Sequence, residues 1–143
     1  VYKRQGKEVY HMSEERKALF QLSMKIREMV EKNKSNSEDQ WGKCREIVCG
    51  AMEQYPNAAE PHNLYGILLE EAGNHTGAMK HFRAAAALDP TYLPARKNLE
   101  RFGSFERDEK IYYTEEDCIE RKEKGFALKK LMFPVFVKKV SSL

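Results

Sequence analysis

The segment with the clearest helix and turn signals, residues 63–90, reads NLYGILLEEAGNHTGAMKHFRAAAALDP. It predicts two α-helices, residues 60–72 and residues 76–88. Gly73 closes the first helix, because glycine most easily adopts the left-handed turn that follows a helix. Pro90 stops the second, since proline offers no backbone N–H and cannot continue a helix. The short connection between them predicts antiparallel neighbours.

Three further helices are expected on either side of this pair. In residues 13–32 the apolar side chains follow one another at steps of three and four, which keeps them on one side of a helix. Residues 38–54 form the next helix, which Pro56 ends. Residues 93–102 form the last one, which ends at Gly103.

The helices that end at Pro56 and Pro90 repeat one pattern at a distance of 34 residues. At equal distances before each proline stand two small positions and one larger apolar position. The matching residues are Cys44 with Ala78, Val48 with Phe82, and Ala51 with Ala85. Such a register is what two helices need in order to pack closely on the pair before them.

These residues resemble the tetratricopeptide repeat (TPR) family. The resemblance rests on Asn63 to Leu69, on Gly73 at the inter-helix turn, and on the small, aromatic, small and proline positions that follow. It departs from the family at His62, where tryptophan is frequent, and at Leu69, where tyrosine is frequent. The residues that the resemblance implies for repeat packing are Leu64, Gly66, Leu69, Ala78, Phe82, Ala85 and Pro90, preceded by Trp41, Cys44, Val48, Ala51 and Pro56.

The resemblance implies an all-α fold: a TPR-like right-handed α-solenoid of two to three antiparallel helix pairs with a C-terminal capping segment. Residues 13–103 form the repeats, and residues 104–143 form a cap and a basic tail. Within the repeats, residues 13–56 are a degenerate repeat, 59–92 a clear one, and 93–103 the opening helix of a third. In the cap, Thr114 to Asp117 form a capping sequence for an expected helix over 115–124, which Gly125 ends. Residues 1–12 are expected to be flexible or non-native.

Composition and motifs narrow the function. The chain has 143 residues, 41% of them hydrophobic and 33% charged, a net charge of +3 and no long uncharged apolar run, which excludes a membrane span and a disordered chain. Three cysteines in a chain of this size favour a reducing, cytoplasmic setting, with a signal or anchor upstream of Val1 left open. The four histidines have no zinc-ligand spacing, and no CxxC, HExxH or glycine-rich phosphate loop occurs. We expect no catalysis, no small-molecule substrate, no cofactor and no metal.

The first helices of successive repeats line the concave side of a solenoid, where an extended peptide or a partner helix binds. The residues expected on this surface are Glu60, Asn63, Ile67, Glu70 and Glu71, followed by Lys97, Asn98 and Arg101. They offer polar groups for a peptide backbone and charges of both signs. We therefore expect a non-catalytic protein–protein interaction module for a protein or peptide partner; the alternative for these residues is a merely solvated helix face.

The tail leaves other functions open. Residues 121–143 carry seven lysines and arginines against one glutamate, while the rest of the chain is net acidic. With its interleaved apolar residues, the part 126–143 either caps the last repeat or contacts an anionic membrane or another partner; nucleic acid is the least favoured. The repeats are alternatively the recognition part of a larger enzyme, and self-association also stays open.

Overall fold

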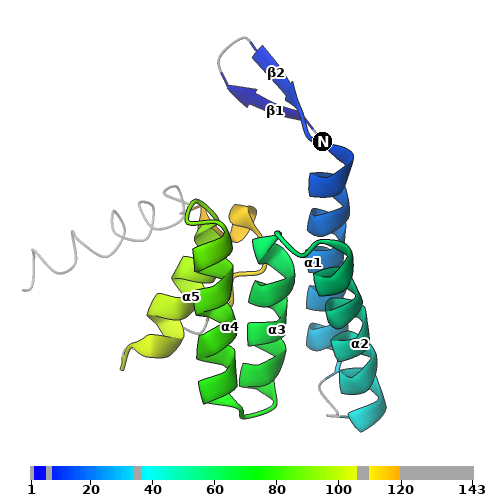
Figure 1. Ribbon diagram of the computed structural model, residues 1–143, viewed down its shortest axis with the longest axis vertical. Coiled ribbons are helices and arrows are strands. Elements are labelled where there is room, and N and C mark those ends of the chain that lie inside the picture. The colour runs from blue at the N-terminus through cyan, green and yellow to red at the C-terminus, as the bar shows by residue number, and fades with distance from the viewer. Residues whose placement is uncertain (1, 6–7, 34–36, 106–109, 120–143) are drawn as a thin grey trace, which may run out of the picture.

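The computed structural model describes residues 2–5, 8–33, 37–105 and 110–119. The helices are α1 (Glu14–Lys32), α2 (Glu38–Gln54), α3 (Ala59–Glu71), α4 (His75–Leu88) and α5 (Leu93–Gly103), followed by a short 3₁₀ helix, η1 (Glu115–Cys118) (Figure 1). The five predicted helices are confirmed to within one or two residues at their ends. The all-α fold class is likewise confirmed for the part of the described chain that carries the core.

A β-hairpin precedes the helices, and sequence patterns did not predict it. Strands β1 (Tyr2–Gln5) and β2 (Glu8–His11) pair antiparallel. Among the described elements these strands contact only each other. Figure 1 shows the hairpin beyond the N-terminal end of α1, away from the other helices, so it contributes nothing to the core described below.

Local chemistry sets the helix ends. The Ser13 side chain accepts a hydrogen bond from the Arg16 N–H at 3.2 Å and so caps α1. Asn74 caps α4 in the same way, with its Oδ1 2.9 Å from the Gly77 N–H. Between α3 and α4, Gly73 has a φ of 79°, a left-handed conformation in which a Cβ is strained. The turn after α3 therefore forms at Gly73, as predicted.

Helix α3 is the centre of the packing. It contacts α1, α2, α4 and α5, and Figure 1 shows α3 and α4 side by side between the α1–α2 pair and α5. The closest approach is at Gly66: a Cβ built there would lie 2.5 Å from Cε1 of Phe82 on α4. Phe82 is 0% exposed and stacks on Phe102 of α5, so its ring is held from both sides.

The structure buries the residues that the repeat pattern pairs. Cys44, Val48 and Ala51 of α2 and their counterparts Ala78, Phe82 and Ala85 of α4 are all buried, as are Leu64 and Gly66 of α3. Trp41 and Leu69 are half-buried against the same cluster, whereas Pro56 and Pro90 are exposed at the helix ends. The matched positions thus share their burial as well as their residue class.

The prediction of a helix over residues 115–124 is wrong for the part of this range that the structure describes. Thr114 and Asp117 form the predicted capping box, but the helix is η1, a 3₁₀ helix of four residues. Ile119 is already extended, with φ −73° and ψ 111°. The Asp117 side chain pairs with Arg27 of α1, and the chain turns here instead of continuing as a helix. Residues 120–124 and the tail 126–143 lie outside the described residues.

Candidate functional site

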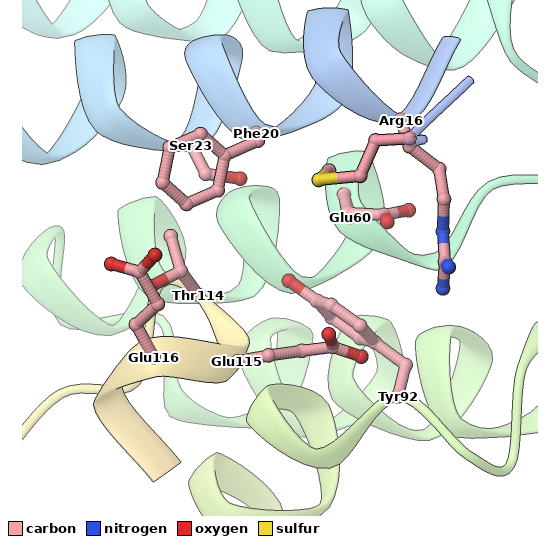
Figure 2. Close-up of a pocket in the computed structure, with 9 residues that line it drawn as sticks. Arg16, Phe20, Ser23, Glu60, Tyr92, Thr114, Glu115 and Glu116 are labelled. Atoms are coloured by element: carbon pink, nitrogen blue, oxygen red, sulfur yellow. The ribbon is translucent and has the colours of Figure 1, made fainter. Parts of the chain in front are cut away.

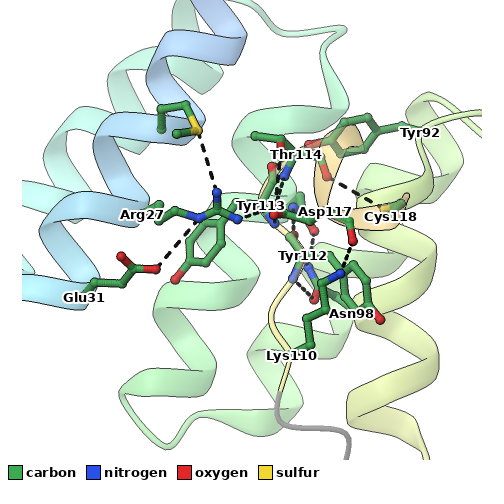
Figure 3. Close-up of polar contacts among 12 residues, drawn as sticks. Arg27, Glu31, Tyr92, Asn98, Lys110, Tyr112, Tyr113, Thr114, Asp117 and Cys118 are labelled. Atoms are coloured by element: carbon green, nitrogen blue, oxygen red, sulfur yellow. Dashed lines mark hydrogen bonds and ion pairs between the residues drawn. The ribbon is translucent and has the colours of Figure 1, made fainter. Parts of the chain in front are cut away.

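The segment of residues 110–119 lies across α1, α3 and α5 instead of adding another long helix to the row. One side chain from each of these helices contacts it: Arg27 of α1 and Asn98 of α5, both labelled in Figure 3, and Asn63 of α3. We call the surface that the three helices form beneath the segment the groove. The groove and the segment are the candidate site, because they gather polar groups that lie far apart in the sequence.

Two buried asparagines hold the backbone of Tyr112. Asn98 donates from Nδ2 to the Tyr112 carbonyl oxygen at 2.7 Å and accepts at Oδ1 from the Tyr112 N–H at 3.0 Å. Asn63 donates to the same carbonyl oxygen at 3.0 Å and accepts from Asn98 Nδ2 at 2.9 Å. Both asparagines are 0% exposed. Because these hydrogen bonds are made to main-chain atoms, they do not depend on the side chain at position 112.

The next residue, Tyr113, places its ring in the core, where it is 3% exposed in one cluster with Ile26 and Ile67. Its carbonyl oxygen accepts a hydrogen bond from the Tyr92 hydroxyl at 3.2 Å. The Arg27 guanidinium lies 4.9 Å from the ring centroid, within cation–π range. Burial raises the pKa of the Tyr113 phenol well above its ordinary value, so the ring is neutral in the folded chain.

Arg27 also forms an ion pair with Asp117, four residues after the tyrosine. The Asp117 side chain further accepts hydrogen bonds from the N–H groups of Tyr113 and Thr114, both at 2.9 Å. Burial works to raise the pKa of Asp117, but the hydrogen bonds from Arg27 and from these two N–H groups outweigh it, and the pKa lies below its usual value. A charged carboxylate thus fixes the turn of η1 against α1.

A pocket continues the groove next to η1 (Figure 2). Helix α1 and Met12 before it supply one wall, α3 and the residue before α5 another, and η1 with the residue before it the last. The lining residues are Met12, Arg16, Phe20, Ser23, Glu60, Tyr92, Thr114, Glu115 and Glu116. Burial is the main cause of the raised pKa of Glu60. At about 90 Å³ the pocket is far smaller than the usual site for a drug-sized ligand.

The structure corrects the predicted concave surface. Asn63, Ile67 and Asn98 were expected on an exposed face, but all three are 0% exposed: the backbone of Tyr112 covers the two asparagines, and Ile67 lies in the apolar cluster that includes Tyr113. The other predicted residues lie around this site or away from it: Glu60 lines the pocket, Glu70 pairs with His75, Glu71 is exposed, Lys97 is half-buried, and Arg101 stacks on Phe102.

Sequence reasoning missed Arg27, Tyr112, Tyr113 and Asp117 as site residues. Arg27 looked like an ordinary charge on the polar side of a helix. The spacing of Thr114 and Asp117 was identified as a helix cap, which is correct but incomplete. The remaining signal was the pair of tyrosines directly before this cap, since two aromatic residues outside a helix are frequently anchors.

The histidines differ from expectation in one respect. The four histidines have no zinc-ligand spacing on any one helix, and their spacing did not indicate that His62 of α3 and His81 of α4 meet: their Nδ1 atoms are 3.2 Å apart and their rings stack. Burial lowers the pKa of both, and His62 lowers that of His81 further. Within the described ranges, no group of three or more histidine, cysteine, aspartate or glutamate side chains is placed to hold a metal ion.

Two findings complete the description of the chain. None of the helices in the described part combines the length and the apolar composition that a membrane crossing needs. Neither family models nor curated proteins nor solved structures yield a match to the chain.

Proposed function

We propose that the chain is a TPR-like right-handed α-solenoid that acts as a non-catalytic module for binding extended peptide segments. The repeat part of this proposal is supported by the matched burial at Cys44 and Ala78 and at Val48 and Phe82, together with the seating of Phe82 on Gly66. In a solenoid each helix pair contacts only its neighbours, which leaves one continuous face for a ligand.

The observation that carries the binding part is the grip of Asn63 and Asn98 on the backbone of Tyr112. An asparagine that both donates to and accepts from one residue reproduces the pairing that a neighbouring β-strand offers. Such main-chain hydrogen bonds supply affinity for an extended peptide, while side-chain pockets supply specificity. The segment 110–119 is then the chain's own occupant of a groove that takes partner peptides in exchange for it.

The test is direct binding of a fluorescently labelled peptide with the sequence of residues 110–119, measured by fluorescence polarisation under reducing conditions. The full chain is used as it is and as the variant Tyr112→Pro, which removes the N–H that Asn98 accepts and leaves both asparagines in place. We expect saturable binding, tighter to the variant because its own segment competes less well.

Two controls accompany this test. Circular dichroism checks that the variant keeps its helices. A peptide methylated on the nitrogen of the residue matching Tyr112 must bind worse than the unmodified peptide, because it lacks the N–H that Asn98 accepts. If the labelled peptide binds neither form of the chain, the groove is a closed structural seat and the proposed function is wrong.

A further inference from the structure

This inference rests on the proposed function and concerns what the groove selects. We infer that it takes, from a partner protein, an extended segment in which an aromatic residue is followed four residues later by an aspartate or glutamate. The groove contributes three contacts to such a segment: the asparagine pair for the backbone, a seat for the ring, and Arg27 for the carboxylate.

The ring seat is specific because of how completely it encloses its occupant. Tyr113 is the buried residue that segment 110–119 adds to the main apolar cluster of the described chain, alongside Ile26 and Ile67, and the partly buried Ile111 packs against the same cluster. The hydroxyl of Tyr92 holds the carbonyl of the same residue at 3.2 Å. A small side chain at this position leaves a void in the core, and a charged one is buried without solvation.

Arg27 couples the ring to the acid. Its guanidinium lies over the Tyr113 ring at 4.9 Å and pairs with the Asp117 carboxylate. The side chains of Arg27 and Asp117 are only 23% and 15% exposed, so solvent screens this pair less than an ordinary surface pair. One cation that contacts two ligand groups requires both of them at a fixed separation.

The turn of η1 fixes that separation. The Thr114 N–H and the Tyr113 N–H both donate to Asp117 at 2.9 Å, which folds the chain back after the aromatic residue. Residues that cap such a turn, threonine or serine after the aromatic residue, therefore fit the selected segment best. In contrast Glu116 is exposed, so the acid one position earlier contributes little to the contact.

A partner protein fits better as the source of this segment than a second copy of the chain. Only six residues of the sequence separate α5 from segment 110–119, so the chain's own segment reaches the groove by an intramolecular step, which a segment from a second copy does not. A second copy offers the same sequence without that advantage. A partner segment with a better-fitting ring or turn exchanges for it.

The experiment uses the Tyr112→Pro chain and four labelled peptides: residues 110–119 unchanged, or with Tyr113→Ala, Asp117→Ala or Glu116→Ala. We expect the first two substitutions to weaken binding at least about tenfold, as loss of a buried anchor does, and the Glu116 control to change it less than about twofold. Light scattering of the unmodified chain at the same concentrations is expected to give a monomer.

A double-mutant cycle tests Arg27 itself. With Arg27→Met added to the Tyr112→Pro chain, the unchanged peptide is expected to bind more weakly, and the Asp117→Ala peptide is expected to lose less affinity than it loses on the Tyr112→Pro chain, because the ion pair is already absent. If the unchanged peptide binds the Tyr112→Pro chain but the substitutions at Tyr113 and Asp117 have no effect, or the Asp117→Ala loss is the same with and without Arg27, this selectivity is wrong while the proposed function stands. A dimer that Tyr112→Pro dissociates makes a second copy the occupant and overturns the partner assignment. Absence of binding by every peptide overturns the proposed function itself.

Discussion

Substitution of Asn98 by alanine is the most informative change to the site. It removes three hydrogen bonds at once: two to the backbone of Tyr112 and one to Asn63. At about 1 kcal/mol net for each bond, and with about 0.5 kcal/mol returned because alanine is the better helix former, the free energy of unfolding should fall by about 2.5 kcal/mol. Asn63→Ala removes two hydrogen bonds, the one from Asn98 and its own to the Tyr112 carbonyl oxygen, and should cost about 1.5 kcal/mol by the same count.

The assay is urea denaturation followed by circular dichroism, combined with hydrogen exchange at the Tyr112 amide. Asn57→Ala, at an exposed position between α2 and α3, is the control and should change the free energy of unfolding by less than about 0.5 kcal/mol. Faster exchange of the Tyr112 amide in Asn98→Ala, with α1 to α4 still protected, is the expected local result. If Asn98→Ala matches the control in stability and in exchange, the hydrogen bonds of Asn98 do not stabilise the backbone of Tyr112, and the groove is not held as described.

Two further predictions concern the packing and the histidine pair. Gly66→Ala pushes a Cβ into Phe82 and should be about 1 to 3 kcal/mol less stable than Gly50→Ala, a helical position with nothing within 4 Å; equal unfolding midpoints would contradict the packing of α3 on α4. For His62 and His81 the pKa in the folded chain is lowered, so the unfolded chain takes up protons first and stability falls as the pH drops below about 6.5. Denaturation at pH 7.5 and 5.5 should show this loss, and the loss should shrink when both are changed to glutamine.

The helices and their register could be predicted because their signals are local. Gly73 and Pro56 end helices for reasons contained in a few residues, and the match of Val48 with Phe82 needs only counting along the chain. The turn at Thr114 was predicted for the same reason. Its short 3₁₀ form was not, because the competing interaction of Asp117 comes from Arg27, on a helix ninety residues earlier.

The site itself escaped prediction because polar residues on a helix are ambiguous. Asn63 and Asn98 were expected on an exposed face but are buried, since nothing near them in sequence indicates that residues 110–114 cover them. His62 and His81 meet across two helices, so spacing on one helix could not reveal their contact. Each miss is a contact between segments far apart in the chain.

The choice of asparagine in the groove favours the proposed binding surface over a purely structural cap. A cap over the end of a helical stack needs only apolar contact, and leucine in place of Asn63 and Asn98 would supply it without the cost of burying amides. Buried amides are satisfied only while a backbone lies across them, as Tyr112 does here, or while water replaces it. An apolar seat that loses its occupant exposes hydrocarbon, whereas an amide seat that loses its occupant is hydrated. Emptying the groove still exposes the apolar seat of Tyr113, but at Tyr112 the asparagine pair lowers the cost of the empty state that exchange of one segment for another requires.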